Sequence, residues 1–158
     1  MKSIARTTLL ISVATLYLGL VPGVQAADTC SNTTVAGKWG FTLTGTLLFP
    51  APTGPVLGAA VGRLSVDAAG NISGTEARNV GGGFANETIT GSWSVSSDCT
   101  ATVTANIYES GVLVRTSVLV AVFVDHSDKI RAVQESLTNP DGSTIPVVIT
   151  LEGNKLFP

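Results

Sequence analysis

The sequence predicts an all-β protein, a single antiparallel up-and-down barrel of about eight strands with one disulfide. After residue 30, apolar and small polar residues alternate and Val, Ile and Thr are frequent, which is the pattern of half-buried strands. Turn-forming stretches such as "DAAGN" and "NPDGS" recur at short intervals and divide the chain into segments of strand length. These two observations favour strands throughout and leave no long helix.

Eight strands joined by short connections favour a meander, in which each strand pairs with the next one along the chain. Closure into a barrel removes the unpaired edges of such a sheet. A two-sheet β-sandwich with Greek-key crossings is the alternative fold. Pro146 cannot donate to a strand ladder, so it predicts a bulge or an open seam in the last strand. The expected strands are 37–49, 57–67, 71–79, 86–96, 99–108, 112–124, 129–137 and 143–153.

Residues 1–26 are predicted to be a secretory signal peptide, which leaves residues 27–158 as a single barrel domain. Lys2 and Arg6 precede the apolar stretch "TLLISVATLYLGLV", and "VQA" supplies small residues at the expected cleavage site. A retained membrane anchor is the alternative, but the apolar run is short for a span and Pro22 interrupts its end. We therefore expect a secreted or periplasmic protein.

Cys30 and Cys99 are the only cysteines, and both follow the predicted signal peptide. In an oxidising compartment such a pair is expected to form a disulfide. In a meander, the start of the first strand and the turn after the fourth lie at the same end of the barrel, so the two cysteines can meet there. Closing a loop of about 70 residues contributes roughly 4 kcal/mol of stability. A sandwich could also bring them together.

Charge and motif content exclude several classes of function. The chain has nine basic and eleven acidic residues, a net charge of −2, and no basic run, so it lacks the electrostatic pattern of a nucleic-acid-binding protein. "GGG" at 81–83 lacks the lysine and the helix of a phosphate-binding loop. The two cysteines leave no zinc cluster if they form a disulfide. No cofactor is predicted.

The single histidine, His126, lies in "DHSDK" beside Asp125. Such a pair can perform acid–base chemistry or bind a metal, but it is also typical of a hydrophilic hairpin turn, which is the interpretation we prefer. Ser and Thr are too numerous to nominate a nucleophile, so no catalytic residue and no enzyme are predicted. Four aspartates expected in turns at one end would suit either Ca²⁺ or turn formation. They are Asp67, Asp98, Asp125 and Asp128.

A phrase occurs twice, as "NTTVAGKWGFT" at 32–42 and "NETITGSWSVS" at 86–96, and it contains both tryptophans, Trp39 and Trp93. In the barrel both are expected to point into the apolar interior, from strands of opposite direction. "GKW" at the start of the first strand resembles the G-x-W of the calycin superfamily, which includes lipocalins and avidins. The resemblance implies an eight-stranded barrel in which Trp39 packs across one end, with an avidin-like cysteine pair. The biotin-contacting tryptophans of avidin and the T-D-Y motif of lipocalins are absent.

Two longer stretches, "VGRLSVDAAGNISGT" and "TITGSWSVSSDCTATVT", resemble a type of small exported bacterial protein. Apolar residues are also frequent in the loops expected at the end opposite the cysteines. This end could be a ligand entrance, a hydrophobic plug or a patch that packs on a partner. The expected function is that of an exported barrel that binds a small apolar ligand in its interior or at its mouth. The candidate ligand-binding residues are Trp39, Phe41, Phe49, Phe84 and Trp93.

Three alternatives stay open. The strand at 112–124 is apolar on both faces, which indicates either a covered central strand or a surface for self-association into a homo-oligomer. General resemblance to the allene oxide cyclase barrel leaves room for an enzyme that works by shaping a cavity. An outer-membrane barrel would line its interior with small polar residues. Those residues would be Thr42, Thr44, Thr100, Thr102 and Thr104.

Overall fold

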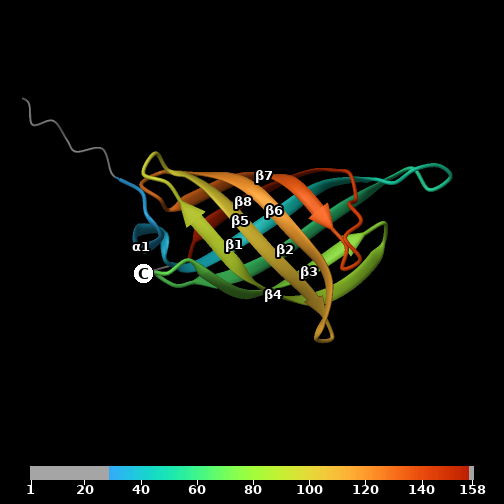
Figure 1. Ribbon diagram of the computed structural model, residues 1–158, viewed down its shortest axis with the longest axis horizontal. Coiled ribbons are helices and arrows are strands. Elements are labelled where there is room, and N and C mark those ends of the chain that lie inside the picture. The colour runs from blue at the N-terminus through green and yellow to red at the C-terminus, as the bar shows by residue number, and fades with distance from the viewer. Residues whose placement is uncertain (1–28, 157–158) are drawn as a thin grey trace, which may run out of the picture.

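The computed structural model describes residues 29–156 and shows a closed antiparallel barrel of eight strands (Figure 1). Each strand pairs with the next, and β8 pairs with β1 to close the barrel. The predicted barrel is therefore confirmed against the sandwich, and the predicted signal peptide lies outside the described residues. The elements are α1 (Asn32–Val35), β1 (Gly37–Leu48), β2 (Pro55–Val66), β3 (Asn71–Val80), β4 (Gly83–Val95), β5 (Thr100–Glu109), β6 (Val112–Val124), β7 (Lys129–Thr138) and β8 (Val147–Lys155).

The interior of the barrel takes every second residue of each strand, because successive side chains of a strand point to opposite faces. In β1, Trp39 and Phe41 are buried, whereas Thr42 and Thr44 are exposed. In β5, Ala101 and Val103 are buried, whereas Thr100 and Thr102 are exposed and Thr104 is half-buried in the same outward phase. The threonines that the membrane-barrel alternative placed inside therefore lie on the outer surface, so that expectation was wrong. Within residues 29–156, no helix has the length and hydropathy to cross a membrane.

The last strand differs from the expected one. It begins at Val147, so Pro146 precedes β8 and does not lie within it. The β7–β8 ladder runs only from Lys129↔Asn154 to Val133↔Thr150. Further along, the two strands approach only through an isolated bridge, Thr138↔Thr144. The expected open seam is therefore present at the mouth end of these two strands.

Three aromatic rings close one end of the barrel. Trp39, Trp93 and Phe123 lie edge to face, with ring centroids 5.4–5.8 Å apart. Trp39 is 1% exposed, and its Nε1 donates a hydrogen bond to the carbonyl of Val35 in α1. Edge-to-face aromatic pairs of this kind stabilise beyond their buried area. The two copies of the repeated phrase thus meet in one cluster, although Asn32 begins a helix and Asn86 lies in β4.

The same end carries the predicted disulfide between Cys30 and Cys99. Their Cα atoms are 4.9 Å apart and they are 69 residues apart in the sequence. Asn32 strengthens the connection, because its Oδ1 accepts from the backbone N–H of Val95 and its Nδ2 donates to the carbonyl of Ala69. Helix α1, which the sequence pattern did not predict, is capped by Ser31. The chain before β1 is thereby fixed across the closed end (Figure 1).

Replacing both cysteines with alanine should lower the free energy of unfolding by about 2–4 kcal/mol, because the loop is then open in the unfolded chain. Urea denaturation followed by tryptophan fluorescence measures this change. The wild-type protein unfolded in the presence of a reducing agent should shift by a similar amount. Unchanged midpoints in both experiments would contradict the prediction.

Candidate ligand-binding cavity

The barrel encloses a cavity of about 300 Å³ between the aromatic cluster and the opposite end. Space is left because β2 directs small residues inward, including Gly58 and Ala60. Gly62, the next inward position, lies directly under the ring of Phe41: a Cβ there would be 2.6 Å from the Phe41 Cζ. An eight-stranded barrel is only just wide enough for side chains to fill it, so a row of small residues on one strand is enough to open a cavity.

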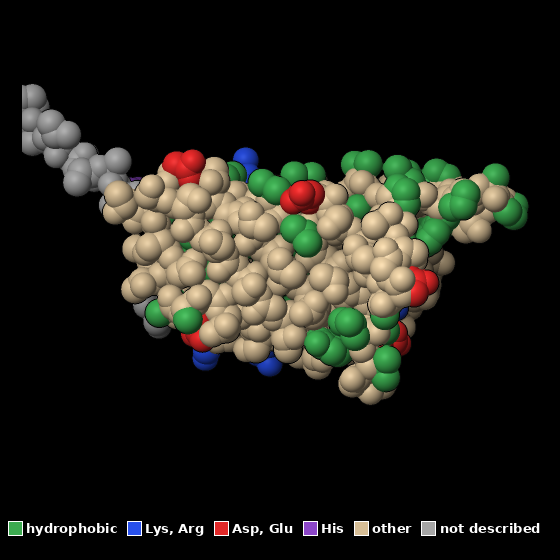
Figure 2. All heavy atoms as spheres, viewed as in Figure 1, with side chains coloured by type: hydrophobic (Ala, Val, Ile, Leu, Met, Phe, Trp, Pro, Cys, Tyr) green, Lys and Arg blue, Asp and Glu red, His purple; other side chains and the backbone are tan. Residues whose placement is uncertain are grey.

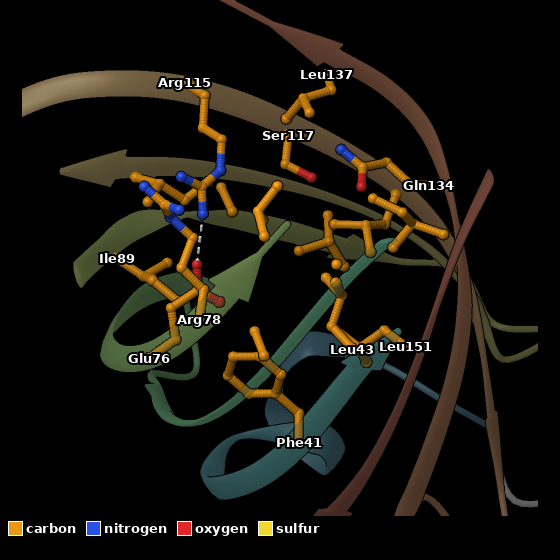
Figure 3. Close-up of a pocket in the computed structure, with 18 of the residues that line it drawn as sticks. Phe41, Leu43, Glu76, Arg78, Ile89, Arg115, Ser117, Gln134, Leu137 and Leu151 are labelled. Carbon is orange, nitrogen blue, oxygen red and sulfur yellow. Dashed lines mark hydrogen bonds and ion pairs between the residues drawn. The ribbon is translucent and has the colours of Figure 1, made fainter. Parts of the chain in front are cut away.

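The cavity has an apolar wall and a polar wall. Strand β3 contributes Glu76 and Arg78 to the polar wall, and β6 contributes Arg115 (Figure 3). Facing them, the apolar wall comes from β1, β7 and β8. Its members are Leu43, Leu47, Leu137, Ile149 and Leu151.

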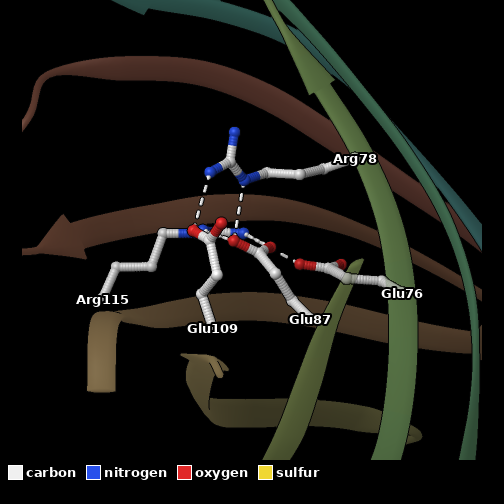
Figure 4. Close-up of polar contacts among 5 residues, drawn as sticks. All are labelled: Glu76, Arg78, Glu87, Glu109 and Arg115. Atoms are coloured by element: carbon white, nitrogen blue, oxygen red, sulfur yellow. Dashed lines mark hydrogen bonds and ion pairs between the residues drawn. The ribbon is translucent and has the colours of Figure 1, made fainter. Parts of the chain in front are cut away.

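The polar wall is organised around Glu87, whose side chain is fully buried (Figure 4). Arg115 binds both of its carboxylate oxygens, through Nη1 at 2.7 Å and Nη2 at 2.5 Å. Arg78 donates from Nε to Glu87 Oε1 at 2.7 Å. Arg115 Nη2 also reaches Glu76 Oε1 at 2.8 Å, and Arg78 Nη2 lies 3.5 Å from Glu109 Oε2. Two guanidinium groups thus share two buried carboxyl groups and one partly exposed carboxyl group.

Burial and pairing move the pKa values of the two buried glutamates in opposite directions. Burial disfavours the charged form of Glu87, but hydrogen bonds from Arg115 and Arg78 outweigh it and lower its pKa to about 2. For Glu76, burial outweighs the attraction of Arg115, and a hydrogen bond with Glu87 adds to it, so its pKa rises to about 7. The pKa of Arg115 is raised, because Glu87 and Glu76 outweigh its burial. Glu87 therefore remains charged near neutral pH, whereas Glu76 changes protonation there.

The structure places the five predicted ligand-binding residues in different surroundings. Phe41 lines the cavity. Trp39 and Trp93 form the closed end and are not among the lining residues, and Trp93 Nε1 is buried without a hydrogen-bond partner within residues 29–156. Phe49 packs against the apolar cluster near the mouth, and Phe84 is 66% exposed on the outer face of β4. Of the five predicted residues, therefore, Phe41 lines the cavity and Phe49 packs against residues that line it.

The charged residues of the polar wall were not predicted from the sequence. Their signal lies in the phase of β3, "NISGTEARNV", in which Ile72, Gly74, Glu76 and Arg78 occupy every second position and face inward. A charged residue in phase with buried apolar residues is unusual and marks a functional or structurally paired group. Glu87 likewise occupies an inward position of β4, two residues before the buried Ile89.

The polar residues predicted in turns form local contacts. The His126 side chain is 83% exposed and lies 3.9 Å from Asp125, which pairs with Lys129 at 2.8 Å. Asp67 and Asp98 each accept hydrogen bonds from groups of their own turn. Residues 29–156 contain no group of three or more His, Cys, Asp or Glu side chains positioned to hold a metal ion. The hydrogen bonds of Asp67 and Asp98 are those of turn residues.

The raised pKa of Glu76 predicts a pH dependence of stability. Folded Glu76 binds its proton up to about pH 7, whereas the unfolded residue releases it near pH 4.5, so stability should fall as the pH rises through 7. We expect the free energy of unfolding to drop by about 1–3 kcal/mol between pH 5.5 and pH 8.5. In Glu76→Gln, whose amide oxygen can still accept from Arg115, this drop should be absent.

Urea titrations at several pH values measure the effect, with Glu152→Gln as the matched control, since Glu152 is exposed on the outer face of β8. The control should keep the wild-type slope. A Glu76→Gln variant that loses stability with pH as steeply as the wild type would contradict the assignment. The lowered pKa of Glu87 acts only at lower pH, below about 4.5, where its protonation destabilises the fold.

Comparison with known proteins gives no relative from which to transfer a function. No protein-family model matches the sequence, and no curated protein matches it. The eight-stranded barrel is compatible with the calycin resemblance, but the same architecture serves many unrelated functions and identifies no family by itself. Function must therefore be argued from the cavity.

Proposed function

We propose that this protein is exported and binds a small, mostly apolar molecule inside its barrel. The observation that carries the proposal is the cavity of about 300 Å³, which has one apolar wall and a few convergent polar groups on the other. Cavities of this size and character are typical of small-molecule sites. The disulfide between Cys30 and Cys99 is compatible with an oxidising compartment and so supports export.

The ligand enters, in this proposal, at the end opposite the aromatic cluster. The cavity extends toward this end, where Leu47, Val80 and Ile145 line it. The β1–β2 hairpin projects beyond the barrel there (Figure 1), and Figure 2 shows hydrophobic side chains along it. An apolar rim lowers the cost of moving an apolar molecule from water into the interior.

Binding can be tested with N-phenyl-1-naphthylamine, an uncharged probe that fluoresces in apolar surroundings. The wild-type protein should bind it saturably. Ala60→Phe places a ring in the cavity and should weaken binding at least tenfold, whereas Val61→Phe should not, because Val61 is 59% exposed on the outer face of the same strand. Thermal melts of both variants check their folding. Equal binding by the wild type and Ala60→Phe would contradict the proposal.

Self-association is a second candidate function. Val120 and Val122 on β6 are 46% and 39% exposed, and Val133, paired with Val120 on β7, is 52% exposed. These valines are therefore partly exposed on the outer face of the barrel. A second copy of the chain could bury these valines, which are the apolar outer residues of two neighbouring strands.

Light scattering over a range of concentrations tests this second function. The wild type should show a mass that increases with concentration, Val120→Asp should abolish the increase, and Val61→Asp on the opposite part of the surface should not. A constant monomer mass for the wild type at every concentration would exclude self-association through this surface.

A further inference from the structure

Two uncharged polar side chains line the cavity next to its charged wall. They are Ser117 of β6 and Gln134 of β7, which are only 6% and 7% exposed. The two strands are adjacent, and Gln134 pairs with Leu119, two residues from Ser117. Figure 3 shows the hydroxyl of Ser117 and the amide of Gln134 directed into the interior. Both are therefore available to a molecule inside the barrel and not to bulk solvent.

These two side chains have unused hydrogen-bonding capacity. Within residues 29–156, the Ser117 hydroxyl makes no hydrogen bond. Gln134 donates from Nε2 to the carbonyl of Ser136 at 3.1 Å, and its Oε1 has no partner in the same part of the chain. Buried polar groups in folded proteins are almost always hydrogen-bonded. Within residues 29–156 the fully enclosed side-chain atom without a partner is Trp93 Nε1, so the Ser117 hydroxyl and Gln134 Oε1 are not sealed in the core and are open to a molecule in the cavity.

The charged wall, by contrast, is already paired. Arg115 binds Glu76 and Glu87, and Arg78 binds Glu87 and approaches Glu109. Glu87 and Glu109 offset the two arginines while Glu76 is protonated, and Glu76 is paired with Arg115 when it ionises. A charged ligand would find no free counter-charge in the cavity, and an unpaired buried charge is strongly disfavoured.

We propose that the ligand is an uncharged, mostly apolar molecule with a hydroxyl group, which accepts a hydrogen bond from Ser117 and donates one to Gln134 Oε1. This inference rests on the proposed binding function. A hydroxyl group both accepts and donates, so it satisfies the two side chains together. A ketone could only accept and would leave Gln134 Oε1 without a partner, and a hydrocarbon would leave both groups unsatisfied.

Competition with bound N-phenyl-1-naphthylamine tests this assignment, using octan-1-ol, octan-2-one, octanoate and octylammonium as competitors with chains of equal length. For the wild type, octan-1-ol should compete at least fivefold better than octan-2-one and at least tenfold better than either ion. In Ser117→Ala and in Gln134→Leu, the preference for the alcohol over the ketone should fall to about onefold, with each competition corrected for the naphthylamine affinity measured on the same variant.

Ser94→Ala is the matched control, since Ser94 is exposed on the outer face of β4 and should leave every competitor unchanged. Equal competition by alcohol and ketone in the wild type would overturn the hydroxyl assignment and leave the binding function standing. If both variants keep the preference, as they would if a bound water satisfied Ser117 and Gln134, the hydroxyl assignment is also overturned and the binding function stands. Failure of the wild type to bind the naphthylamine probe or any competitor would overturn both proposals.

Discussion

Closure of the barrel is the constraint on which the other features depend. Once β8 pairs with β1, every strand must direct alternate side chains into one interior of fixed width. The volume of those side chains then decides where the interior is solid and where it is hollow. Trp39, Trp93 and Phe123 fill one end, whereas Gly58 and Ala60 leave space toward the other. The cavity is thus a direct result of which residues occupy the inward positions.

The charged wall has a different energetic role from the aromatic end. Burying ion pairs contributes little net stability, because the loss of hydration offsets the attraction between the charges. Removing Arg115, however, would leave Glu87 with Arg78 as its single cationic partner, although the Glu87 side chain has no exposed surface. Each guanidinium group is therefore held in place by the carboxylates that it binds. Its effect is to give one side of the cavity a fixed polar surface, while Glu76 allows that surface to change charge near neutral pH.

The sequence predicted the strands, the disulfide and the inward tryptophans because each depends on a local pattern or on the direction of a strand. The contacts of the polar wall depend also on the register between neighbouring strands. Arg115 and Gln134 lie in phase with the buried residues of their strands, but the β5–β6 ladder shifts register at Ile107/Tyr108, so alternation alone does not show which side chains face each other across the interior. A second shift in the β6–β7 ladder precedes the Gln134 pairing. Irregularities of this kind are invisible in an alternating pattern, so the pattern could place these polar side chains inward but could not show which of them meet.

The two ends of the barrel differ in how firmly they are held. At the closed end, the disulfide, α1 and the aromatic rings all join segments that are distant in the sequence. At the mouth, the β7–β8 ladder ends at Val133↔Thr150, and residues 139–146 connect the strands mainly through single bonds such as Ile145 N–H to the carbonyl of Leu137. Segments with few ladder bonds open at lower free energy than paired strands. Because Ile145 also lines the cavity, the least constrained part of the barrel is the part that borders the proposed ligand. Opening the mouth would therefore break few hydrogen bonds, whereas the disulfide and the aromatic cluster hold the closed end together.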